Sequence, residues 1–105
     1  MQEIIKGTTP VLKFTFSTVD PADISTAYLT IKDMNKNVIL SVDNSGASTG
    51  ADYIAWELTQ AQSLLLPVDE NVAAMCDWLL NDGTRGRSEI VVYTVGDTGK
   101  NEVMS

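Results

Sequence analysis

The stretch Val11-Leu12-Lys13-Phe14-Thr15-Phe16 decides the fold, because apolar side chains occupy every second position along it. One face carries Leu12 and both phenylalanines, and the opposite face carries Val11, Lys13 and Thr15. A period of two is typical of a β-strand that is buried on one side and wet on the other. The stretch therefore predicts a strand with one face in a hydrophobic core.

The same period recurs along most of the chain. Val72–Leu80 is the longest such segment, and its apolar residues on both faces favour a central position in a sheet. Pro, Gly, Asn and Asp gather between the segments, as expected of turns and loops. The further predicted strands are 27–32, 38–42, 53–58 and 88–95, with hairpins joining 27–32 to 38–42 and 72–80 to 88–95.

One segment predicts a helix instead. Thr59 is followed three residues later by Gln62, which is the spacing of a capping box, and the apolar Leu64 and Leu65 come next. Pro67 ends the segment, because the residue before a proline avoids the helical conformation. We expect one or two helical turns that close one end of the core.

These elements define the expected fold. The chain has 105 residues, which suits a single domain with one core. About six or seven short strands at regular spacing are typical of a two-layer sandwich. We predict an all-β, immunoglobulin-like antiparallel β-sandwich over 1–105 with one short helix, and a flexible polar tail over 96–105.

Composition excludes several classes of function. There is no histidine and one cysteine, so a Ser-His-Asp triad, a Cys-His pair and a structural zinc site cannot be built. Carboxylate-only catalysis stays open, but no pair of acids stands out. The net charge of −7 argues against nucleic acid, whose phosphates require a basic surface. We predict no enzyme, no cofactor, no metal, no nucleic acid partner and no membrane partner.

The acidity itself has two interpretations: it keeps the protein soluble, or it docks on a basic partner. The segment Met1–Lys6 has an acid where a secretory signal would be basic, and no long apolar run follows it. We therefore expect synthesis in a cytoplasm. Cys76 lies among apolar neighbours and is expected to be a small buried side chain.

Aromatic residues divide into two predicted groups. Trp56 and Trp78 are in phase with the inward-facing residues of their strands, which predicts core packing. Tyr28, Tyr53 and Tyr93 are assigned to the opposite faces, where an exposed ring could stack on a sugar.

The predicted loop from Asp43 to Asp52 lacks the alternating acids of a calcium-binding loop.

The segment Asp82–Gly86 concentrates charge and glycine, but it lacks the Gly-Lys-Ser/Thr ending of a phosphate-binding loop. A plain hairpin turn explains it, and so does an exposed loop in which Arg85 reaches a carboxylate of a partner. The candidate contact residues are Asp82, Thr84, Arg85 and Arg87.

Several of these stretches together resemble a known family. Ile5–Pro10, Asp23–Lys32, Leu58–Leu64 and Trp78–Gly86 resemble small virion structural proteins of phages and prophages of gut Firmicutes. The layout is also similar to the N-terminal domain of phage baseplate upper proteins, without the receptor-binding region that follows in that family.

The resemblance implies a non-enzymatic virion module of tail, baseplate or head decoration that binds other virion proteins, with a homo-oligomer left open. Its location would be the virion, after synthesis in the host cytoplasm. Two alternatives stay open: a small acidic phage inhibitor of a host nucleic-acid-binding protein, and a carbohydrate-binding module.

Overall fold

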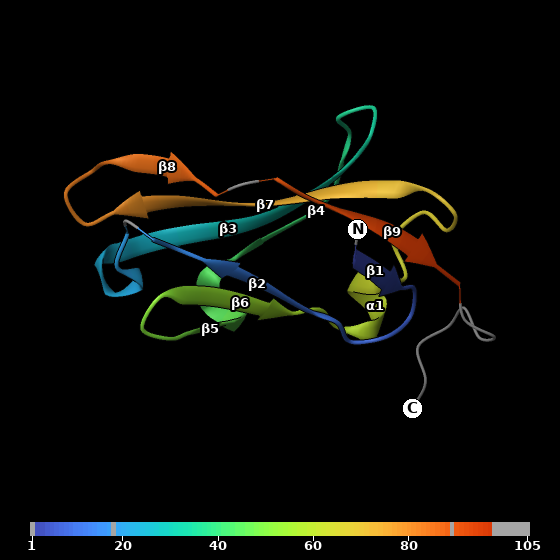
Figure 1. The fold of residues 1–105 in the computed structure, drawn as a ribbon, viewed down its shortest axis with the longest axis horizontal. Helices are drawn as coiled ribbons and strands as arrows, with labels where there is room; N and C mark the ends of the chain where they lie inside the picture. Colours follow the sequence, from blue (N-terminus) through green and yellow to red (C-terminus); the bar gives the residue numbers. More distant parts are fainter. Residues whose placement is uncertain (1, 18, 89, 98–105) are drawn as a thin grey trace.

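Two β-sheets face each other in the computed structural model, which describes residues 2–17, 19–88 and 90–97 (Figure 1). The larger sheet has the order β1-β9-β7-β3-β4, and β8 also pairs with β7; the smaller sheet has the order β2-β6-β5. The strands are β1 (Gln2–Ile5), β2 (Val11–Thr15), β3 (Ile24–Asp33), β4 (Val38–Asp43), β5 (Ala47–Thr49), β6 (Tyr53–Glu57), β7 (Asn71–Leu80), β8 (Arg85–Arg87) and β9 (Val91–Gly96). The helical segments are η1 (Pro21–Asp23), η2 (Asn44–Gly46) and α1 (Gln60–Ser63).

The predicted immunoglobulin-like β-sandwich is confirmed as an all-β sandwich with one short α-helix. Within the described residues there are nine strands, more than the six or seven expected. One pair also departs from the antiparallel expectation, since β1 runs parallel to β9 with Gln2 opposite Tyr93. The central position predicted for 72–80 is correct, because β7 lies between β3 and β9.

Two strands lie where the sequence predicted none. β1 falls in a start that carries no clear alternation, and β5 falls in the predicted loop 43–52. Both owe their conformation to partners: β1 is paired with β9, and β5 with β6. Short polar segments of this kind become strands because a neighbouring strand satisfies their backbone groups.

The predicted final strand 88–95 is divided. β8 pairs with one half of β7, and β9 pairs with the other half. In β8, Gly86 lies opposite Trp78 with the two arginines exposed on either side of it, whereas in β9 the buried residues are Tyr93 and Val95. Even-numbered positions therefore face inward in β8, whereas odd-numbered positions face inward in β9.

The core forms where the inward faces of both sheets meet. β3 contributes Ala27, Leu29 and Ile31, all with no exposed surface, as the alternation predicts. One aromatic pair joins the two layers: Phe16 and Trp78 meet edge to face with ring centroids 4.9 Å apart. The remaining buried apolar side chains include Ile4, Leu12, Phe14, Leu40, Ile54, Trp56, Leu58, Leu66, Val72, Ala74, Cys76, Tyr93 and Val95.

The short helix α1 lies beside β1 at one end of the sandwich (Figure 1). Its capping box is present in full: the Thr59 side chain accepts from the Gln62 backbone N–H, and the Gln62 side chain accepts from the Thr59 backbone N–H. Ser63 is completely buried, and its hydroxyl accepts from Gly7 N–H and donates to the Thr8 carbonyl. These bonds attach α1 to the segment that connects the two sheets.

Aspartates shape several exposed turns. The carboxylate of Asp33 accepts from the backbone N–H groups of Asn35 and Asn37 at the tip between β3 and β4. Hydrogen bonds from Asn37 hold the pKa of Asp33 below its ordinary value. The charged form of this side chain therefore stabilises the turn.

No helix in the described ranges is long and apolar enough to cross a membrane. Of the tail predicted to be flexible, 96–105, the part 98–105 lies outside the described residues.

Candidate functional site

A cleft of about 360 Å³ opens between the two sheets along one flank of the sandwich. Its lining comes from β2 and the segment after it, from β7, from the residue that follows β8, and from the start of β9. The lining residues are Lys13, Phe14, Thr15, Phe16, Ser17, Val19, Trp78, Ser88 and Val91.

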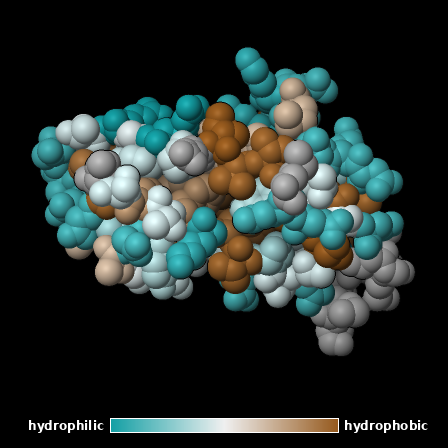
Figure 2. Space-filling view, viewed as in Figure 1, coloured by the Kyte–Doolittle hydropathy of each residue, from teal (hydrophilic) through white to brown (hydrophobic). Residues whose placement is uncertain are grey.

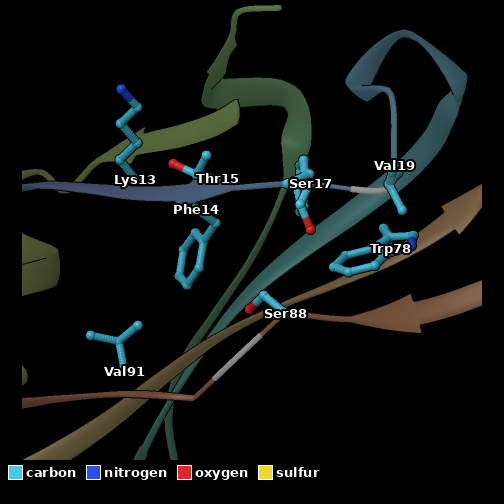
Figure 3. A pocket seen from close by; sticks show the side chains of 9 residues that line it. Lys13, Phe14, Thr15, Ser17, Val19, Trp78, Ser88 and Val91 are labelled. Carbon is cyan, nitrogen blue, oxygen red and sulfur yellow. The ribbon is translucent and has the colours of Figure 1, made fainter. Parts of the chain in front are cut away.

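The lining of the cleft is mixed, with five apolar residues and four polar ones. Phe14 points from β2 into the space between the sheets, towards the strand that carries Val91 (Figure 3). Lys13 and Thr15 point the other way, out of the smaller sheet (Figure 3). Trp78 and Val91 are half-buried, so each presents part of an apolar side chain to the cleft.

The strand β2, which borders the cleft, is an edge strand. Its ladder joins it to β6, with Leu12 opposite Trp56. Pro10 accepts from Leu58 N–H and Phe16 donates to the Asp52 carbonyl, so even-numbered residues direct their backbone groups towards β6. The N–H and C=O groups of Val11, Lys13 and Thr15 consequently point outward, and the ladders of the described chain provide no partner for them.

The opposite flank of the sandwich is closed by the chain itself. There η2 connects β4, at the edge of the larger sheet, directly to β5, at the edge of the smaller one. The indole N–H of Trp56 donates to the Asp43 carbonyl over 2.8 Å at this crossing. The hollow on that flank, about 440 Å³, therefore lies against a covered edge.

Apolar side chains gather in the middle of the face seen in Figure 2, between the larger sheet above and the smaller sheet below. Among the large apolar residues with high exposure are Val11, at 59%, on β2, and Ile90, at 47%, just before β9. Scattered exposed apolar residues are ordinary, but Val11 lies on the edge strand β2 and Ile90 directly precedes the lining residue Val91.

Among the described residues that line the cleft, Lys13 on β2 is the only charged one. Arg85 and Arg87 lie on β8, outside that lining, and β7, which contributes Trp78 to it, also carries Asp77. The Lys13 ammonium lies over the Tyr53 ring, 4.3 Å from its centroid, which is a cation–π geometry.

The predicted contact residues separate into a turn and a strand. Asp82 accepts from Thr84 N–H over 2.8 Å within the turn, and Gly83 takes a positive φ of 90°. Arg85 and Arg87 lie on β8, and Arg85 also lines a shallow hollow of about 280 Å³ with Tyr28 on the outer face of the larger sheet. A plain hairpin turn accounts for the first pair, and contact with a partner stays a prediction for all four residues.

The assignments of the aromatic residues are partly corrected. Trp56 is buried as predicted, whereas Trp78 is only half-buried and forms a wall of the cleft. Tyr28 is exposed as predicted, but the outward position predicted for Tyr93 is wrong, because this side chain is only 5% exposed. The error follows from the change of phase between β8 and β9, which moves Tyr93 to the inward face and raises its pKa through burial.

Cys76 is a core residue, as predicted, with no exposed surface. Burial, with a smaller contribution from the Asp77 charge, raises the pKa of its thiol to about 12. In the described part of the chain, no group of three or more His, Cys, Asp or Glu side chains is placed to hold a metal ion.

The sequence did not predict a site at the cleft. The alternation of 11–16 identified β2, but it assigned the phenylalanines to a closed core. Pro10 before the strand and Lys13 within it are residues typical of an edge strand, and they are the signals that could have revealed the open flank.

The fold and the cleft define this chain as a β-sandwich protein with one open flank. No family model matches the chain and no curated protein matches it, so the resemblance to phage virion proteins stays a prediction. Among solved structures, it is similar to the crystal structure of CopC from Methylosinus trichosporium OB3b, with 16% identity and a TM-score of 0.54. The match covers 95% of this chain and 89% of that chain.

This comparison corrects the predicted function. The similarity to CopC points to a different function from that of a phage virion module. The prediction of a phage virion module is therefore wrong. At 16% identity the likeness establishes the fold alone, so no ligand of CopC is assigned to this chain.

Proposed function

We propose that this chain is a non-enzymatic binding domain that accepts an extended polypeptide segment of a partner along β2. One observation carries the proposal: the outer backbone edge of β2, for which the described residues provide no ladder partner, lies beside a cleft between the sheets that Phe14, Trp78 and Val91 help to line. A segment added to that edge would extend the smaller sheet in the manner of strand addition.

The geometry assigns separate roles to the backbone and the side chains of such a segment. Lys13 and Thr15 each offer one N–H and one C=O, and each main-chain hydrogen bond contributes about 1 kcal/mol whatever the partner's sequence. Alternate side chains of an added strand point to opposite faces, so every second one would enter the cleft. Burying an aliphatic side chain there contributes about 1.5–3 kcal/mol, and this contribution selects the sequence.

A proline substitution tests the backbone contact. Thr15→Pro removes an outward N–H and leaves the β6 ladder intact, because proline is tolerated at the free side of an edge strand. Peptides selected from a random displayed library on the wild-type protein should bind this variant about five- to a hundredfold more weakly, since a carbonyl of the peptide loses its donor. Binding is measured by fluorescence anisotropy on variants shown by circular dichroism to be folded.

Thr49→Pro is the matched control. Thr49 is an exposed threonine on β5, the other edge of the same sheet, and its N–H also points away from β6, since Gly50 N–H next to it bonds to the Tyr53 carbonyl. This variant should bind the selected peptides as the wild type does. Equal binding by both variants, or peptides that protect amides far from Val11, Lys13 and Thr15 from hydrogen exchange, would overturn the proposal.

A further inference from the structure

We infer that the segment accepted by β2 belongs to a different protein, and that it carries an acidic side chain opposite Lys13 between apolar side chains that enter the cleft. The inference rests on the proposed function, which it makes specific.

The register of β2 determines which partner positions are charged and which are apolar. Partner residues opposite Val11, Lys13 and Thr15 would point out of the sandwich, as those three do. Partner residues opposite Leu12 and Phe14 would point into the cleft, where they would meet Trp78 and Val91. The preferred segment therefore alternates, with its central outward residue facing an ammonium group.

A second copy of this chain is a poor occupant of the edge. Antiparallel pairing of two β2 strands with full overlap places Lys13 opposite Lys13. If one strand is shifted by two residues, the two lysines become diagonal neighbours on the same face. Like charges directly opposite one another destabilise a strand pair. A lysine in the middle of an edge strand is also a common way to prevent pairing between identical edges. Two copies would in addition bring together two chains of net charge −7.

The positive charge on β2 favours an acidic partner, although the protein as a whole has a net charge of −7. Lys13 is the only charged residue of β2 and the only charged one among the described residues that line the cleft. Glu57 faces Val11 across the ladder, which leaves Lys13 as the charge at the centre of the edge. Exposed charges more than about 8 Å apart are largely screened at physiological ionic strength, so the nearest groups dominate.

A set of three synthetic peptides tests the inference. They have blocked ends and the sequence Ser-Val-Thr-Val-Xaa-Val-Thr-Val-Ser, with Glu, Gln or Lys at Xaa. The wild type should bind the Glu peptide most tightly, the Gln peptide less tightly and the Lys peptide most weakly. The affinity should fall about two- to fivefold at each step. Lys13→Glu should reverse this order.

Lys32→Glu is the matched control, because it changes the net charge equally but lies on β3 in the other sheet. It should keep the wild-type order; a reversal by Lys32→Glu as well would overturn the inference. Peptides that bind in no order, while protecting the Val11, Lys13 and Thr15 amides from exchange, would leave the proposed function standing and overturn the acidic partner. Absence of binding by all three peptides, together with a stable dimer in ultracentrifugation, would overturn both.

Discussion

At the scale of single residues, environment decides between side chains that look equivalent in the sequence. Trp56 and Trp78 both lie in phase with inward apolar positions, yet Trp56 is 3% exposed and Trp78 forms part of the open cleft. Trp56 also stacks edge to face on Phe14, with ring centroids 6.0 Å apart, and donates to the Asp43 carbonyl. The first is therefore a structural residue, and the second contacts both the core and the cleft.

This difference predicts unequal losses of stability. Trp56→Ala should lower the free energy of unfolding by about 3–5 kcal/mol, because it leaves a large cavity and an acceptor without its donor. Trp78→Ala should cost less, since part of that ring already contacts water. Urea unfolding followed by far-ultraviolet circular dichroism measures both values, and a larger loss for Trp78→Ala would contradict the assignment.

At the scale of elements, the strength of a local signal decides what sequence can predict. The capping box of α1 was visible as Thr59 and Gln62, and the structure contains both of its hydrogen bonds. By contrast, β5 has a small and polar sequence, and it is a strand because β6 pairs with it. The change of phase between β8 and β9 likewise depends on their two separate stretches of β7, which the local alternation cannot encode.

The cap gives an element-scale prediction. Thr59→Ala should lower the free energy of unfolding by about 1 kcal/mol, because the N–H of Gln62 loses its side-chain acceptor. Thr59→Ser retains that acceptor and should stay within about 0.5 kcal/mol of the wild type. The pair is compared by urea unfolding; a loss of the same size in Thr59→Ser would show that the methyl group, and not the cap, stabilises this end.

At the scale of the whole molecule, the arrangement of edges decides how the protein meets others. One flank is closed by η2, and on the other flank the described residues provide no partner for the outer edge of β2, which has Lys13 at its centre. A free outer edge on β2 beside a cleft can pair with any extended chain. The charge of Lys13 on that edge limits which chains can pair.

Removing the charge should therefore change the assembly of the protein. Lys13→Val is expected to raise self-association, because it removes the like-charge contact from a β2–β2 pair and adds a β-branched residue that favours strands. Lys32→Val is the control, because β3 is paired on both sides, and it should not raise self-association. Sedimentation velocity at several concentrations compares them, and a Lys13→Val variant that stays as monomeric as the control would contradict the role assigned to Lys13.

What the sequence determined by itself was the class of the fold and the faces of most strands. Alternation places Leu12, Leu29 and Ile31 inward because side-chain direction depends only on position along a strand. The turns at Asp33 and Asp82 and the cap of α1 follow from hydrogen bonds between residues close in the sequence.

Only the tertiary structure decided which strands meet. The parallel pairing of β1 with β9 joins the two ends of the described chain, and the absence of a described partner on the outer side of β2 opens the cleft. Alternation specifies a buried face but not a neighbour, because any backbone can donate to any other. The candidate site therefore lay outside sequence reasoning: it depends on which edge stays unpaired, and that is a property of the whole sandwich.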